Sequence, residues 1–224
     1  MAGDIARSRR NRKIAAIAAG ALVVGLGAAY TLASWNDSEW VWGGADGDPG
    51  IGTATFEVQQ NTTAPFDDAA GWTDEEENPG GELQFSPGAL ALTPGDTVYA
   101  PVALRTTAGS EAASVELQGA VPAAGSPAPT HDAALAAAVQ VSVYTTDAAA
   151  PPACDATFDP AGWTQILADQ PLGTTSSGPQ SLDADAGSTQ HYCFAITLPE
   201  GADDALQGQQ ISPAWEFASE SVAP

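Results

Sequence analysis

Two cysteines and two histidines are the side chains whose chemistry is most readily tested in this sequence. Cys154 and Cys193 belong to no Cys-x-x-Cys pair, and neither His131 nor His191 lies in a His-Glu-x-x-His pattern. We therefore expect a Cys154–Cys193 disulfide, with a metal site as the alternative, and two ordinary surface or half-buried histidines. A disulfide that closes a loop of about 40 residues stabilises a fold by about 4 kcal/mol in the chain-entropy model.

Nucleophilic catalysis has no matching motif. The Gly-x-Ser-x-Gly nucleophile elbow is absent, and so are glycine-rich loops that would cradle a phosphate. Cys–His catalysis conflicts with the expected disulfide. Sequence order alone leaves a Ser-His-Asp triad open, but we predict no catalytic residues and no enzyme.

Carboxylates gather in several turn-rich stretches, and calcium prefers such oxygen ligands. These clusters are Asp46/Asp48, Asp67/Asp68, Asp74–Glu77 and Asp183/Asp185. None has the spacing of an EF-hand loop. We interpret them as a solvated acidic surface and predict no cofactor, with calcium as the alternative.

The charge distribution excludes some classes of partner. The chain of 224 residues has 28 Asp and Glu against six Lys and Arg, and Arg105 is the single Lys or Arg after residue 13. No basic patch can neutralise nucleic-acid phosphates or anionic lipids, so we expect no nucleic-acid partner. Charged residues make up only 15% and hydrophobic ones 44%, so the chain can bury a core.

Residues 1–34 have the pattern of a secretory signal. Met1–Lys13 is basic, Ile14–Ala33 is uncharged and apolar, and small residues Ala33 and Ser34 precede Trp35. The apolar run is also long enough to span a bilayer as an uncleaved anchor. In either case we expect residues 35–224 to be secreted or at the cell surface, with membrane contact only through the signal segment.

The exported part alternates apolar and polar residues over short stretches, which is typical of half-buried strands. This pattern predicts an all-β fold, an antiparallel jelly-roll or β-sandwich domain over residues 51–224, preceded by the N-terminal hydrophobic signal helix. Proline cannot donate to a ladder, so Pro101 predicts an edge strand or a bulge. A short helix is expected over His131–Ala138, capped by Thr130. The expected strands are 53–59, one or two within 82–92, 97–105, 114–118, 139–144, 165–168, 191–198 and 211–217.

The segment 35–50 contains three tryptophans, Trp35, Trp40 and Trp42. One hypothesis is that they pack as a first strand on their own domain, or lie at the membrane interface while the signal is attached. The other is that the segment is a donor strand that adds to an open sheet edge of another subunit. Trp72, Trp163 and Trp215 are expected to be core or loop-anchoring residues.

Several motifs resemble those of a known family. The junction Thr31–Asp37 resembles signals processed by the SipW-type signal peptidase. The segments Leu92–Val98, Tyr192–Phe194 and Pro213–Phe217 are similar to parts of the TasA/camelysin-like family of exported proteins. The resemblance implies a secreted jelly-roll domain that forms biofilm-matrix fibres by strand donation. The expected disulfide, the scarcity of lysine and the long acidic loop are departures from that family.

These observations predict a secreted cell-surface structural protein, a subunit or accessory of an extracellular fibre. The expected partners are a SipW-type signal peptidase and other copies of the chain, which would associate into filaments. The alternative is a monomeric envelope-associated binding module for a glycan or calcium, and a metalloprotease comes third. Because the exported part is strongly acidic, we expect assembly to be favoured by salt or low pH.

Overall fold

The computed structural model describes residues 38–41, 44–45, 48–50, 52–125 and 129–222. The chain divides into two units, residues 1–52 and residues 53–224. In the first unit, β1 (Gly44–Ala45) and β2 (Asp48–Pro49) form a small antiparallel pair. The predicted signal segment and cleavage residues Ala33, Ser34 and Trp35 lie outside the described residues. No helix in the described part is long and apolar enough to cross a membrane.

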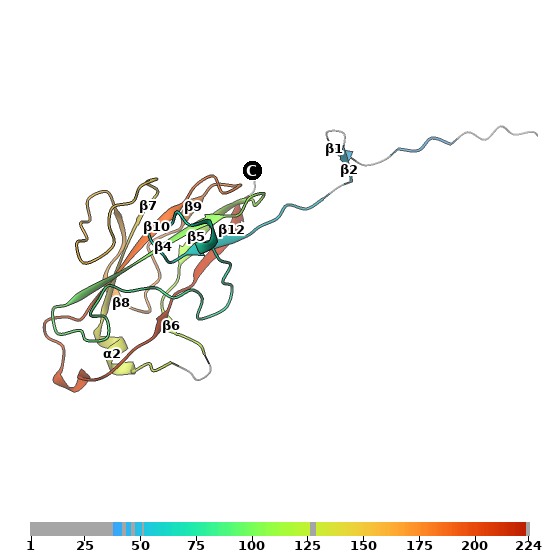
Figure 1. Ribbon diagram of the computed structural model, residues 1–224. Helices are drawn as coiled ribbons and strands as arrows, with labels where there is room; N and C mark the ends of the chain where they lie inside the picture. The colour runs from blue at the N-terminus through green and yellow to red at the C-terminus, as the bar shows by residue number, and fades with distance from the viewer. Residues whose placement is uncertain (1–37, 42–43, 46–47, 51, 126–128, 223–224) are drawn as a thin grey trace, which may run out of the picture. The chain divides into compact units, whose positions relative to one another are not determined.

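The second unit is an all-β sandwich of antiparallel sheets, as the sequence predicts (Figure 1). The larger sheet has the order β3-β4-β10-β7-β8, and the smaller one has the order β12-β5-β9. The strands of the larger sheet are β3 (Val58–Asn61), β4 (Thr97–Thr106), β10 (Gln190–Thr197), β7 (Gln140–Thr146) and β8 (Thr164–Pro171). Those of the smaller sheet are β12 (Phe217–Val222), β5 (Ala112–Leu117) and β9 (Gln180–Leu182).

A third, two-stranded sheet pairs β11 (Pro213–Ala214) with β6 (Val121–Pro122). The only helical elements in the described residues are one short α-helix and two 3₁₀ turns. They are α2 (Ala133–Ala138), η1 (Ala69–Gly71) and η2 (Asp204–Leu206).

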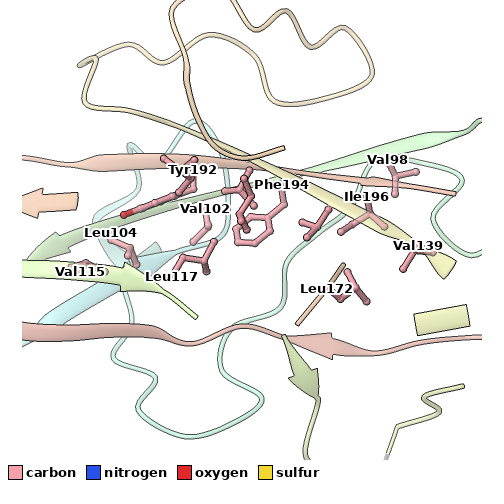
Figure 2. Packing of buried hydrophobic residues seen from close by; sticks show 14 of the residues in the cluster. Val98, Val102, Leu104, Val115, Leu117, Val139, Leu172, Tyr192, Phe194 and Ile196 are labelled. Atoms are coloured by element: carbon pink, nitrogen blue, oxygen red, sulfur yellow. The ribbon is translucent and has the colours of Figure 1, made fainter. Parts of the chain in front are cut away.

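The core lies between the two larger sheets (Figure 2). Tyr192 and Phe194 of β10 point into it, and Val115 and Leu117 of β5 meet them from the opposite sheet. The rings of Tyr192 and Phe217 lie 4.8 Å apart and join the sheets at one end. Each such side chain stabilises the fold by about 1.5–3 kcal/mol when it is fully buried. The alternating pattern of the predicted strands 97–105 and 191–198 thus identifies core residues.

The central strand β10 is buried on both faces, although its alternation of apolar and polar residues predicts one buried face. His191, Cys193 and Ala195 lie on the face opposite Tyr192, and each is no more than 5% exposed. Two loops cover this outer face of the larger sheet. One follows β3 and the other follows β7, so the sandwich has an additional layer of irregular chain.

The prediction for Pro101 holds only locally: β4 is an inner strand without a bulge, because it pairs with β3 on one side and β10 on the other without a register shift, but its half that contains Pro101 has no strand neighbour on the β3 side. The proline is tolerated because β3 pairs only with Ala103–Thr106 and has ended before Pro101. Tyr99 presents its backbone to the same side and exchanges hydrogen bonds with Ser86. Because no strand pairs with this side of β4 at Pro101, the absence of an N–H on the proline leaves no ladder hydrogen bond unformed.

Other differences concern short or irregular segments. The predicted strand 53–59 becomes regular only at Val58, and the predicted strands in 82–92 are a loop with turns. Conversely, β9 lies between the expected strands 165–168 and 191–198, where the sequence pattern predicts no strand. The helix is capped by Asp132 instead of Thr130, since the Asp132 carboxylate accepts from the Leu135 N–H at 2.8 Å.

Candidate functional site

The predicted cysteine pair is brought together by the fold. Cys154 and Cys193 form a disulfide with a Cα–Cα distance of 5.6 Å. Cys193 lies on the outer face of the central strand and is fully buried. The disulfide therefore ties the loop between β7 and β8 to the middle of the larger sheet.

An aromatic cluster anchors the same loop a second time. The Phe158 ring centroid lies 5.2 Å from that of Tyr99 and 4.8 Å from that of Tyr144. Trp163 follows at 6.1 Å. Because these rings come from β4, β7 and the loop itself, the loop is held by packing as well as by the covalent bond. This confirms Trp163 as a loop anchor.

The second covering loop, residues 62–72, is anchored over the opposite part of the face. The Phe66 and His191 rings lie 5.2 Å apart, and the Arg105 guanidinium lies 4.0 Å from the centre of the Trp72 ring. Thus the single Lys or Arg side chain after residue 13 stacks on an aromatic ring. Trp215, with its ring 5.0 Å from that of Phe194, packs against the core as predicted.

The two histidines have different surroundings. His191 is buried beneath Phe66, and burial lowers its pKa. His131 is half-buried, and its Nδ1 accepts from the Ser212 N–H at 3.3 Å. Neither is within a group of metal-ligating side chains: in the described ranges, no three His, Cys, Asp or Glu residues could share an ion.

Several loop carboxylates cap turns. Asp68 accepts from the Ala70 N–H at 2.9 Å, and Asp185 accepts from the Gly109 N–H at 2.8 Å. Asp96 accepts from the Thr93 N–H, and hydrogen bonds from Thr93 lower the pKa of this exposed carboxyl. Asp68 and Asp96 thus hold the backbone of their own turns, whereas Asp185 links its loop to a turn that is distant in sequence.

The N-terminal segment exposes apolar side chains. Trp40 is 92% exposed and Val41 is 95% exposed, and residues 38–41 form no strand. Trp35 and Trp42 lie outside the described residues. A fully exposed tryptophan beside an exposed valine is a large apolar surface that a second molecule could bury.

An acceptor for such a segment would be an unpaired strand edge. Two candidate edges of the larger sheet are already used by the chain. On β3, Gln60 exchanges backbone hydrogen bonds with Thr73, each 2.9 Å. On the uncovered half of β4, Ser86 donates to the Tyr99 carbonyl at 2.7 Å and its hydroxyl accepts from the Tyr99 N–H.

The edges at β8 and β9 are poor templates as well. On β8, the Ile166 carbonyl accepts from the Ser177 N–H, and the Ala168 carbonyl accepts from the Gln170 side chain. Asp169 has φ 47°, and the pairing with β7 shifts register there, so the strand is irregular. On the other sheet, β9 has only three residues.

The remaining edge, β12, is regular over six residues and has β5 as its only strand neighbour. The Gln118 N–H donates to the Glu216 carbonyl, so the backbone groups of Glu216 point toward β5. The backbone groups of successive residues along β12 then point alternately away from β5 and toward it. Ala218, Glu220 and Val222 therefore face β5, whereas Phe217, Ser219 and Ser221 face away from it. In the described part of the chain, one hydrogen bond occupies that side, from Ser219 Oγ to the Phe217 carbonyl at 3.2 Å.

Sequence reasoning did not find this edge. The sequence predicts a final strand that ends at Phe217, and nothing in the pattern of residues 218–222 shows which side of the strand stays unpaired. The fold and site define a disulfide-containing all-β sandwich, and within its described residues the two larger sheets have one regular open edge, at β12. Among known proteins, no family model and no curated protein matches the chain.

Proposed function

We propose that the protein is exported and is a structural subunit or accessory of an extracellular fibre, assembled by strand donation between copies. The observation that supports this proposal best is the near-complete exposure of Trp40 and Val41 in the first unit, whereas the second unit has a well-packed core of its own. An exposed pair of this kind leaves apolar area in water, and burial on a partner would remove it.

The donor mechanism follows from the chemistry of strands. The backbone of the N-terminal segment would form main-chain hydrogen bonds with a sheet edge, and its tryptophans would supply apolar contact. While the signal is attached, the segment is held at the membrane. Cleavage by a SipW-type signal peptidase, which the resemblance implies, would release it for addition to a neighbouring subunit at the cell surface.

Point substitutions test this proposal while keeping the N-terminal segment 35–50 in place. We expect Trp40→Ala together with Val41→Ala to abolish filament formation by residues 35–224, as measured by sedimentation. The matched control is Leu90→Ala, which removes an apolar side chain that is 87% exposed on the sandwich unit. Filaments in the Trp40/Val41 variant at the wild-type yield would contradict strand donation by this segment.

The binding-module hypothesis predicts a different result. A monomer that never assembles, but releases heat on titration with millimolar calcium or with a glycan, would favour an envelope-associated binding protein. Calorimetry on the same preparation therefore distinguishes the two functions.

A further inference from the structure

The structure carries an inference about which part of the sandwich receives the donated strand, and it rests on the proposed function. We propose that the outer edge of β12 is the acceptor, and that its occupant is the Ser38–Val41 segment of a second copy. The edges of β3, β4, β8 and β9 are occupied, irregular or short, as described above. Among the edges of the two larger sheets in the described residues, only β12 combines regular geometry with backbone groups that face outward.

The outward groups form a usable ladder. Ser219 and Ser221 each present an N–H and a carbonyl to the open side, because their neighbours Ala218, Glu220 and Val222 bond to β5. The side chains of residues 220–222 are exposed, and Val222 is 47% exposed. The far half of the edge is therefore accessible to another strand.

The side chains of the segment suit the two faces of this edge. In an extended strand, Trp40 points to one face and Glu39 and Val41 to the other. The inner face of β12 begins with Phe217, which contacts Tyr192 in the core. Trp40 placed on that face would extend the aromatic row, and Val41 would lie on the outer face that carries Val222.

The outer face also explains why addition would depend on ionic strength. Glu116 and Glu220 lie there, around a shallow hollow that is lined in addition by Ser114, Pro179 and Ala218. An incoming segment brings Glu39 toward these carboxylates. Like charges repel, and Arg105 is the single Lys or Arg after residue 13. Salt should therefore strengthen binding of the segment, because it screens the repulsion between these carboxylates.

The test uses a synthetic peptide of residues 35–43 and the sandwich unit, residues 53–224, which contains the whole described core. Amide hydrogen exchange followed by NMR reports which edge the peptide covers. We expect slowed exchange at Ser219 and Ser221. Protection at β8 or elsewhere, or no binding at millimolar peptide, would overturn the assignment.

Proline variants make the result specific to the edge. Ser219→Pro removes only an outward N–H, and we expect it to weaken peptide binding by about tenfold or more. Ser219→Ala keeps the N–H, so it should bind like the wild type. Ser221→Pro serves as a second variant if Ser219→Pro does not fold.

The outcome separates the assignment from the proposed function. Equal peptide binding by Ser219→Pro and the wild type would refute β12 as the acceptor. Filaments of residues 35–224 that disappear in the Trp40/Val41 variant would still support strand donation in that case.

Discussion

Removing the disulfide should destabilise the sandwich strongly while leaving its fold in place. The perturbation is the double substitution Cys154→Ala and Cys193→Ala, which avoids an unpaired thiol. In the chain-entropy model, a loop of about 40 residues gives a loss of about 4 kcal/mol. Domains are commonly stable by about 5–15 kcal/mol, so the variant should remain folded but lose a large share of its stability.

The structure indicates why the fold should survive. Phe158 still packs between Tyr99 and Tyr144, so the loop retains its second anchor. Cys193 itself occupies a fully buried position, where alanine is tolerated with a small loss of packing.

Urea denaturation followed by tryptophan fluorescence measures the effect, and calorimetry should show a fall in Tm of about 8–16 °C. The unreduced and reduced wild type give the matched comparison, because reduction opens the same loop without changing a residue. A free-energy loss below about 1 kcal/mol would refute the loop-closure reasoning.

Three further perturbations test the loop anchor, the buried histidine and the acidic surface. Phe158→Ala should lower the free energy of unfolding by about 1–3 kcal/mol, because the Phe158 ring is only partly buried. Proteolysis within residues 147–163 should also become faster, and an unchanged cleavage rate would contradict the role of Phe158 as an anchor. Burial lowers the pKa of His191, so the unfolded chain takes up a proton before the folded chain as the pH falls below about 6.5, and the free energy of unfolding should decrease there. His191→Phe should reduce this pH dependence, measured as the difference between urea midpoints at pH 7.5 and pH 5.5. The same difference in the variant and the wild type would contradict a role of His191. Filament growth should accelerate from low to about 0.15 M salt, where the screening length falls to about 8 Å, and a rate independent of salt would count against repulsion between acidic subunits.

The sequence was sufficient to predict the sandwich because its long strands alternate strongly. Val102 and Leu104 repeat every second residue in β4, as do Tyr192 and Phe194 in β10, and this period specifies a buried face. The lone cysteine pair likewise left one simple disulfide. Alternation lies within one segment and the cysteine pair follows from a count of two cysteines, so neither prediction depends on knowing which strands are neighbours.

Strand neighbours and the additional loop layer could not be predicted in the same way. Pro101 signalled an edge strand, but the limited extent of β3 explains its tolerance within an inner strand. Segment 82–92 contains apolar residues at strand-like spacing, yet it pairs only through Ser86 and otherwise turns. The open side of β12 depends on the pairing of residues distant in sequence, which no local pattern encodes.

The most direct test of the central claim is negative-stain microscopy of residues 35–224 beside residues 43–224, both aged at high concentration in salt. Strand donation predicts regular filaments from the longer chain only, with both chains folded and containing the Cys154–Cys193 disulfide. Filaments from the shorter chain would contradict strand donation by the tryptophan segment. A persistent monomer of the longer chain would contradict self-assembly itself.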